Sequence, residues 1–112
     1  MTLRGPILVT GAHGQLGAEL AAALEPYGQV VATGRAELDL ADADAIVATM
    51  RALKPALVVN AAAYTAVDLA EKEESLARAI NGVAPGILAD EAKRADAALI
   101  RKIRHIRVPS VF

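Results

Sequence analysis

Three glycines, each separated from the next by two residues, stand between an apolar run and a segment of helical period. The apolar run 6–10 predicts a strand buried on both faces, as in a parallel sheet. From Gly14 onward, a leucine at every fourth position predicts a helix. Gly11 lets the chain turn off the strand, Gly14 lets a phosphate group approach the backbone, and Gly17 lets the helix pack on the strand. A strand, a glycine turn and a helix in this order predict a dinucleotide-binding loop, with a ligand-free tight turn as the alternative.

Downstream of this loop the chain alternates between strand-like and helix-like segments. Short apolar runs bounded by turn residues predict buried strands, and apolar residues three or four positions apart predict helices. Asp42 stands where an N-cap residue would begin one of these helices, and Pro55 would end it. The alternation predicts the α/β class: a Rossmann-type doubly wound parallel sheet with helices on both faces, truncated after about the fifth strand. The predicted strands lie at 6–10, 29–33, 37–40, 56–60 and 97–100, and the predicted helices at 14–24, 42–53 and 69–94, the last bent around 81–85.

Composition excludes several classes of protein. The chain has 112 residues, enough for one domain, and a hydrophobic fraction of 54%, which is too high for a disordered segment. It has no cysteine, which excludes disulfides, thiolate metal sites and cysteine nucleophiles, and we expect no metal site. A net charge of −1 argues against nucleic-acid binding, and no apolar run is long enough to span a membrane. Arg4 and Gly5 come too early for a signal peptide, so we expect a cytoplasmic domain.

Charge is distributed unevenly along the chain. Residues 1–100 carry 8 basic and 13 acidic side chains, whereas residues 101–112 carry four basic side chains and no acidic one. We therefore divide the chain into a partial NAD(P)-binding Rossmann domain at 1–100 and an atypical basic tail at 101–112. A divergent end, a damaged reading frame and an engineered terminus would each explain the tail. Docking of the tail on an acidic partner would rest on four charges only.

Further segments resemble the dTDP-4-dehydrorhamnose reductase family, which belongs to the extended short-chain dehydrogenase/reductases. The Gly-x-x-Gly-x-x-Gly spacing is typical of that superfamily, and residues 35–40, 58–68 and 80–89 resemble segments of the family. The string Asn-Ala-Ala-Ala-Tyr-Thr-Ala-Val-Asp at 60–68 is the most specific of them. The resemblance covers about residues 6–100. It implies an NAD(P)H-dependent oxidoreductase that reduces dTDP-4-keto-6-deoxy-L-mannose to dTDP-L-rhamnose, with this nucleotide sugar as a partner by resemblance only.

The resemblance also implies positions for the cofactor. Gln15 and Leu16 match positions beside the pyrophosphate, and residues 61–64 match a loop that lines the cofactor. Asp39 and Leu40 match positions beside the adenine, where a carboxylate can accept a hydrogen bond from the amino group and a leucine can pack on the ring. A solvated loop acid is the alternative for Asp39, and close helix packing is a compatible alternative for the alanines. The predicted cofactor-binding residues are Gly11, His13, Gly14, Gln15, Leu16, Gly17, Arg35, Asp39, Leu40, Ala61, Ala62, Ala63 and Tyr64.

The end of the second predicted strand bears on which cofactor is preferred. Proteins that prefer NAD usually place an acid there to bind the ribose 2′-hydroxyl. Here Gly34 offers no carboxylate, and Arg35 can pair with a 2′-phosphate. We therefore expect NADP(H) to be preferred and NAD(H) to remain possible. The alternative is that Arg35 is a surface charge and that both cofactors bind alike.

The catalytic pair of the superfamily, Tyr-x-x-x-Lys, is absent from this sequence. Tyr27 and Tyr64 are its tyrosines, and the residues four positions later are Val31 and Asp68. The family's catalytic threonine would fall within 107–110, which contain no threonine. We therefore predict no catalytic residue and no activity of the chain alone. The alternative is a non-catalytic nucleotide-binding or regulatory module of the same family. An open edge of the truncated sheet would favour a homodimer.

Overall fold

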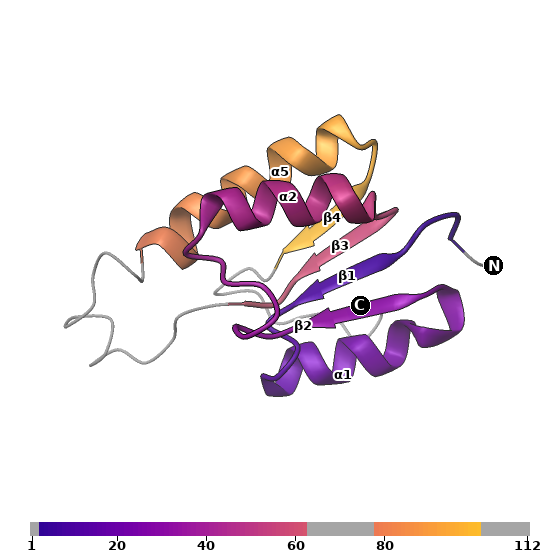
Figure 1. The fold of residues 1–112 in the computed structure, drawn as a ribbon. Coiled ribbons are helices and arrows are strands. Elements are labelled where there is room, and N and C mark those ends of the chain that lie inside the picture. Colours follow the sequence, from indigo (N-terminus) through magenta and orange to yellow (C-terminus); the bar gives the residue numbers. More distant parts are fainter. Residues whose placement is uncertain (1–2, 63–77, 102–112) are drawn as a thin grey trace.

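Four short apolar strands form one parallel sheet in the computed structural model, which describes residues 3–62 and 78–101 (Figure 1). The order of the strands across the sheet is β2-β1-β3-β4. Their register aligns Thr10 of β1 with Thr33 and Asn60, and Asn60 with Arg101. The carboxyl ends of all four strands therefore lie at one edge of the sheet. The strands are β1 (Ile7–Thr10), β2 (Val30–Thr33), β3 (Leu57–Asn60) and β4 (Ala98–Arg101).

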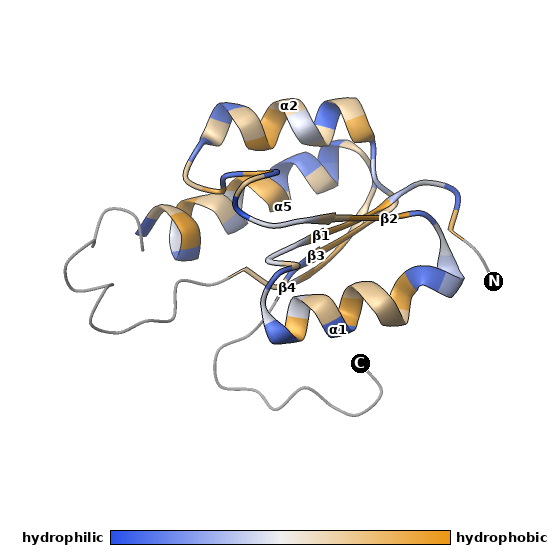
Figure 2. Cartoon of the chain, turned by 60° about the horizontal axis from the view of Figure 1, so that its bottom comes forward, coloured by the Kyte–Doolittle hydropathy of each residue, from blue (hydrophilic) through white to orange (hydrophobic). Residues whose placement is uncertain are grey.

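Successive side chains of β1 serve two separate cores. Ile7 and Val9 are fully buried on the face that α1 (Gln15–Leu24) covers. Leu8 is fully buried on the opposite face, against α2 (Ala43–Leu53) and α5 (Ala84–Arg94). Figure 2 shows the hydrophobic strands enclosed between α1 on one side and α2 with α5 on the other. The predicted doubly wound α/β sheet is confirmed, because a strand buried on both faces needs helices on both sides.

Local residues explain where the helices begin and end. The carboxylate of Asp42 accepts a hydrogen bond from the Ala45 amide at 3.1 Å, which confirms it as the N-cap of α2. Ile46 and Met50 are buried, and α2 ends at Leu53; its C-cap, Lys54, has a left-handed backbone (φ 49°) and is followed by Pro55. α1 ends where a short 3-10 helix, η1 (Glu25–Tyr27), begins with a proline in its first turn.

The last predicted helix is irregular at the expected place. A π-helical segment, η2 (Ala79–Val83), runs directly into α5. The amide of Ala84 donates to the carbonyl of Ala79, five residues back, just before Pro85, which has no amide to donate. Residues 63–77, which include the expected start of this helix, lie outside the described residues.

The strand predicted at 37–40 is wrong. The amides of Glu37 and Leu38 donate to the carbonyl of Gly34, and the amide of Asp42 donates to the carbonyl of Asp39, so this stretch is a series of turns. Leu38 and Leu40 are nevertheless buried in the α2/α5 core. Alternating apolar and polar residues indicate which side chains are buried, and a series of turns can bury every second side chain as a strand does. The described sheet therefore has four strands rather than five.

The last strand of the sheet extends beyond the predicted domain boundary at residue 100. β4 continues through Arg101, so the first residue of the predicted basic tail belongs to the sheet. Residues 102–112 lie outside the described part of the chain. β2 and β4 are the edge strands of the described sheet, and pairing of an edge with a second copy stays a prediction. No helix in the described ranges has the length and apolar character needed to cross a membrane.

An ion-pair cluster joins α2 to α5. The carboxylate of Glu91, only 8% exposed, accepts a hydrogen bond from Arg51 Nε at 3.0 Å and has Arg94 Nε at 3.5 Å. The Arg51 guanidinium holds the pKa of Glu91 below its usual value, against the opposing effect of burial. The charged form of Glu91 is therefore stabilised in the folded chain.

Replacing Glu91 with glutamine will lower the melting temperature at neutral pH, because the charge that binds Arg51 across the two helices is lost. A lowered pKa in the folded state means that this stabilisation is full above the unfolded pKa of about 4.3 and is lost as pH falls through the folded pKa. The difference between Glu91→Gln and wild type, measured by circular dichroism melts, should therefore shrink in acid. Glu19→Gln, on the exposed side of α1, is the control, and an equal loss at every pH would contradict the ion-pair explanation.

Candidate functional site

The loops that follow β1 and β3 leave the sheet side by side at its carboxyl edge. β1 lies between β2 and β3, so the chain winds to one side of β1 after the first helix and to the other side after the second. Ligands of open α/β sheets bind at such a switch point, outside the carboxyl ends of the strands. The glycine loop 11–17 follows β1 at this place.

Gly11 brings the two loops into direct contact. It has a left-handed backbone (φ 65°), and a Cβ built on it would lie 2.6 Å from the amide nitrogen of Ala62 and 2.8 Å from the carbonyl carbon of Ala61. No side chain fits there, because the neighbouring atoms are backbone atoms that have no room to move. The structure therefore brings three of the predicted residues, Gly11, Ala61 and Ala62, together.

A buried hydrogen bond supports the same contact from below. The hydroxyl of Thr10 donates to Asn60 Oδ1 at 2.6 Å, and both residues are almost fully buried. The same oxygen accepts from the amide of Ala62 at 3.3 Å, and the amide of Ala61 donates to the carbonyl of Thr10. Neither Thr10 nor Asn60 was among the predicted site residues. A sequence feature that could have identified them is that each is the polar last residue of an apolar run.

Gly17 and Gly14 have different reasons to be glycine. A Cβ at Gly17 would overlap the carbonyl oxygen of Gly11 and lie 2.7 Å from its carbonyl carbon, so the packing of α1 on the loop requires glycine. A Cβ at Gly14 would meet only the Gly11 oxygen at 3.4 Å, an ordinary contact, and the φ of −79° suits any residue. Neither the packing nor the backbone conformation therefore requires glycine at position 14, although N-cap positions favour it.

The first turn of α1 is open to an anion. Gly14 is the N-cap residue, no side chain of the described residues caps the helix, and its first turn holds no acid. The free amides and the positive end of the helix dipole favour a phosphate at such a position. Gln15 is exposed and Leu16 is half-buried in this turn.

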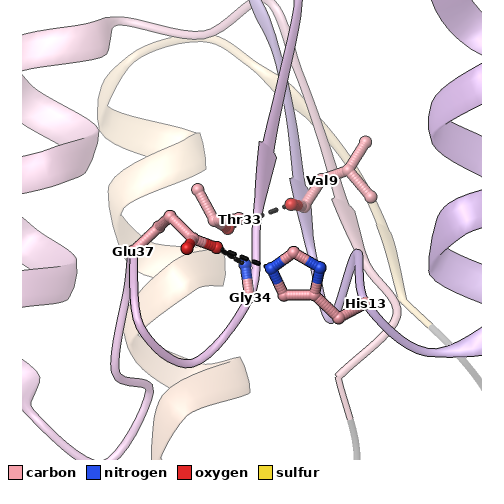
Figure 3. A network of polar contacts seen from close by, with 5 residues as sticks. All are labelled: Val9, His13, Thr33, Gly34 and Glu37. Atoms are coloured by element: carbon pink, nitrogen blue, oxygen red, sulfur yellow. Dashed lines mark hydrogen bonds and ion pairs between the residues drawn. The ribbon is translucent and has the colours of Figure 1, made fainter.

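A polar network joins the glycine loop to the turn after β2 (Figure 3). Glu37 Oε1 accepts a hydrogen bond from the amide of Gly34 at 2.6 Å and lies 2.9 Å from His13 Nε2. The Gly34 amide, and after it the His13 ring, lower the pKa of Glu37 below its usual value. The hydroxyl of Thr33, the residue before Gly34, donates to the carbonyl of Val9 at 3.0 Å. His13 was among the predicted cofactor-binding residues, and Glu37 was not.

The remaining predicted residues lie around the turn after β2 or outside the described chain. Arg35 is exposed on this turn. Asp39 is half-buried, and its carboxylate accepts a hydrogen bond from the amide of Ala41 at 2.9 Å. Leu40 is 7% exposed and packs in the α2/α5 core, so contact of its side chain with an adenine ring stays a prediction. Ala63 and Tyr64 lie outside the described residues.

A metal centre finds no support in the described ranges. No group of three or more His, Asp or Glu side chains within residues 3–62 and 78–101 is arranged to hold a metal ion. The side chains that converge at the carboxyl edge are instead hydrogen-bond donors and acceptors that hold backbone segments together. The arrangement suits a ligand bound by backbone amides.

Comparison with known proteins shows which chains share this arrangement. The family model described as RmlD substrate binding domain matches residues 5–103. The dTDP-4-dehydrorhamnose reductase of Burkholderia thailandensis is 51% identical over 88 residues, which are 79% of this chain and 30% of that protein. The reductase of the same name from Streptomyces griseus is 46% identical over 95 residues, 84% of this chain and 31% of that protein.

Solved structures of reductases with the same name superimpose on this chain. The dTDP-4-dehydrorhamnose reductase of Clostridium acetobutylicum superimposes with a TM-score of 0.78 at 38% identity, covering 84% of this chain and 34% of that one. The reductase of Bacillus anthracis, solved in complex with NADP, gives a TM-score of 0.78 at 30% identity over 88% of this chain and 36% of that one. This chain spans about a third of the length of the relatives it matches. The match of nearly the whole sequence to the family model shows that the chain belongs to the dTDP-4-dehydrorhamnose reductase family.

Proposed function

We propose that this chain is the NADP(H)-binding part of a reductase that acts on a nucleotide-linked 4-keto sugar, with NAD(H) as a second possible cofactor. The observation that carries the proposal is Gly14, which neither packing nor backbone conformation requires to be glycine. Close approach of a pyrophosphate to the backbone is a reason for a glycine at the start of a helix after a parallel strand, in addition to the general preference of N-cap positions for glycine. The NADP found in the Bacillus anthracis relative supports the choice of ligand.

The residues present fit a dinucleotide. The amides of Gln15 and Leu16, in the uncapped first turn of α1, would bind the pyrophosphate, because they face no acid and no capping side chain. The backbone of Ala61 and Ala62, in contact with Gly11, would form the adjoining wall. By resemblance to the family, Ala63 and Tyr64 would also bind the cofactor. The carboxylate of Asp39 would accept a hydrogen bond from the adenine amino group. When bound, the cofactor supplies the hydride for reduction of the ketone.

Arg35 supports the preference for NADP(H). It follows the end of β2, next to the glycine loop, and its guanidinium is exposed to solvent. A guanidinium donates two parallel hydrogen bonds to the charged oxygens of a 2′-phosphate. A 2′-hydroxyl has one uncharged oxygen and cannot form this pair. The preference rests on this one side chain.

The experiment that tests cofactor binding is thermal unfolding with and without NADPH. At a free NADPH concentration of 100 times Kd, the free energy of unfolding should rise by about 2.7 kcal/mol. Gly14→Ala should abolish this increase, because the new methyl group occupies the path of the pyrophosphate, while costing less than about 1 kcal/mol of stability without ligand.

Gly17→Ala is the matched control for Gly14→Ala. Its Cβ overlaps the Gly11 backbone, so it should cost about 1–3 kcal/mol of stability even without ligand. If NADPH stabilised wild type and Gly14→Ala equally, the explanation for Gly14 would be wrong. If neither NADPH nor NADH stabilised wild type, the proposed function would be wrong.

Replacing Arg35 with alanine should reduce the preference for NADPH over NADH about five- to tenfold, the equivalent of about 1–1.4 kcal/mol for an exposed charge-assisted pair. Titration by intrinsic or cofactor fluorescence gives both dissociation constants. Affinity for NADH should stay within about twofold, because NADH lacks the 2′-phosphate that Arg35 would bind. An unchanged ratio would assign the preference to other residues.

Reduction of the sugar should not occur with these residues alone. Neither Tyr27 nor Tyr64 has a lysine four residues later, so no residue pair of the superfamily type is present to deliver the proton. An assay with NADPH and dTDP-4-keto-6-deoxy-L-mannose should show no turnover above background in the cytoplasmic pH range. Turnover by this chain would contradict that prediction. If the chain binds NADPH but does not bind the sugar nucleotide, the second candidate is favoured, a non-catalytic nucleotide-binding or regulatory module.

A further inference from the structure

A carboxylate lies at the tip of β2 that the proposed binding of a dinucleotide does not yet use. Glu37 stands twenty positions after Gly17, although the sequence around Gly34 suggested that this place lacks an acid. Its Oε1 atom is 2.6 Å from the Gly34 amide, directly after the end of β2. The chain thus returns through a turn and places the charge of Glu37 at the residue that directly follows the second strand.

The carboxylate is fixed between two loops. His13, from the glycine loop, has Nε2 2.9 Å from the same Oε1 atom (Figure 3). A Cβ at Gly34 would overlap the imidazole ring, so the glycine there allows the ring to reach Glu37. The hydrogen bond from the Thr33 hydroxyl to the carbonyl of Val9 links the end of β2 to β1 next to this contact. Glu37 is therefore a bridge between the glycine loop and the turn that carries Arg35.

The charge on this bridge is present at neutral pH and reaches solvent. The Gly34 amide and the His13 ring lower the pKa of Glu37, so the carboxylate is ionised. Its side chain is 46% exposed, which leaves its field open to a ligand in front of the strand ends. An acid at the end of the second strand favours a ribose 2′-hydroxyl and repels a 2′-phosphate. Arg35, two residues earlier, acts in the opposite direction.

We propose that Glu37 is a specificity-determining residue for the adenosine ribose: its charge opposes that of Arg35, weakens binding of NADP(H) and leaves NAD(H) as a usable cofactor. The inference rests on the proposed function, since it needs a dinucleotide bound at the glycine loop. It assigns the balance between the two cofactors to a pair of opposite charges on one turn. His13 holds the carboxylate in place.

Glu37→Gln tests the charge without removing the bridge. The amide oxygen of glutamine still accepts from Gly34 and His13, so the turn should keep its conformation. Affinity for NADPH should rise about three- to tenfold, and affinity for NADH should stay within about twofold or fall. The gain for NADPH should shrink at high salt, because exposed charges are screened. Direct titration of both cofactors at low and high salt measures each effect without any turnover.

Two matched variants separate charge from position. Glu25→Gln removes the same charge from η1, which precedes β2 at the opposite end of the sheet, and should leave the ratio of the two affinities unchanged. His13→Asn breaks the bridge but keeps the carboxylate. It should weaken both cofactors by similar factors, which a change in charge would not do.

The outcomes distinguish this inference from the proposed function. If wild type binds NADPH and Glu37→Gln leaves the ratio of affinities unchanged, the inference is overturned and the proposed function stands. The inference is also overturned if Glu25→Gln raises NADPH affinity as much as Glu37→Gln does, because the effect would then be one of net charge. If wild type binds neither cofactor, the proposed function fails and the inference fails with it. A selective gain for NADPH in Glu37→Gln alone supports the inference.

Discussion

The backbone of the turn after β1 lies against the backbone of the segment after β3, and the rest of the candidate site depends on this contact. At Gly11 a side chain would occupy the space of Ala61 and Ala62. The buried hydrogen bond between Thr10 and Asn60 holds the strand ends that carry both segments. Since the N-cap of α1, Gly14, lies three residues after Gly11, the contact also determines where the first-turn amides of α1 point. A ligand of this site would bind to backbone whose position is already set.

The scaffold behind the contact is small, and it is packed on both faces of the sheet. Each strand has four residues, and β1 buries all of them, so successive side chains must serve two different helix layers. On one layer, Glu91 joins α5 to Arg51 of α2 from an almost buried position. The loops at the carboxyl edge are therefore supported from both faces of the sheet, as the loops of binding sites usually are.

Charge at the tip of β2 adds selectivity to this scaffold. Arg35 and Glu37 share one turn, and a hydrogen bond to the Gly34 amide draws the carboxylate back to the strand end. His13 connects the same carboxylate to the glycine loop. A dinucleotide bound along the carboxyl edge would therefore meet two opposite charges near its adenosine ribose. The effect of these exposed charges on binding depends on ionic strength.

Much of the fold followed from local sequence patterns. The apolar runs, the leucines of α1, the Asp42 cap and the irregular turn before Pro85 each report burial or backbone geometry within a few residues, and the structure confirms them. The strand predicted at 37–40 failed for the same reason. An alternating pattern reports which side chains are buried, and Leu38 and Leu40 are buried from a turn.

The sequence by itself determined the class of fold, the glycine loop and the family, because glycine spacing and hydrophobic period are local properties of the chain. Only the tertiary structure decided which polar residues meet. Thr10 and Asn60 are 50 positions apart, and His13 and Glu37 are 24 positions apart. Whether such pairs meet depends on strand order and register, and on a turn that folds an acid back onto Gly34. Strand order, register and this turn are properties of the packed molecule. Each depends on contacts between segments that are far apart in the sequence.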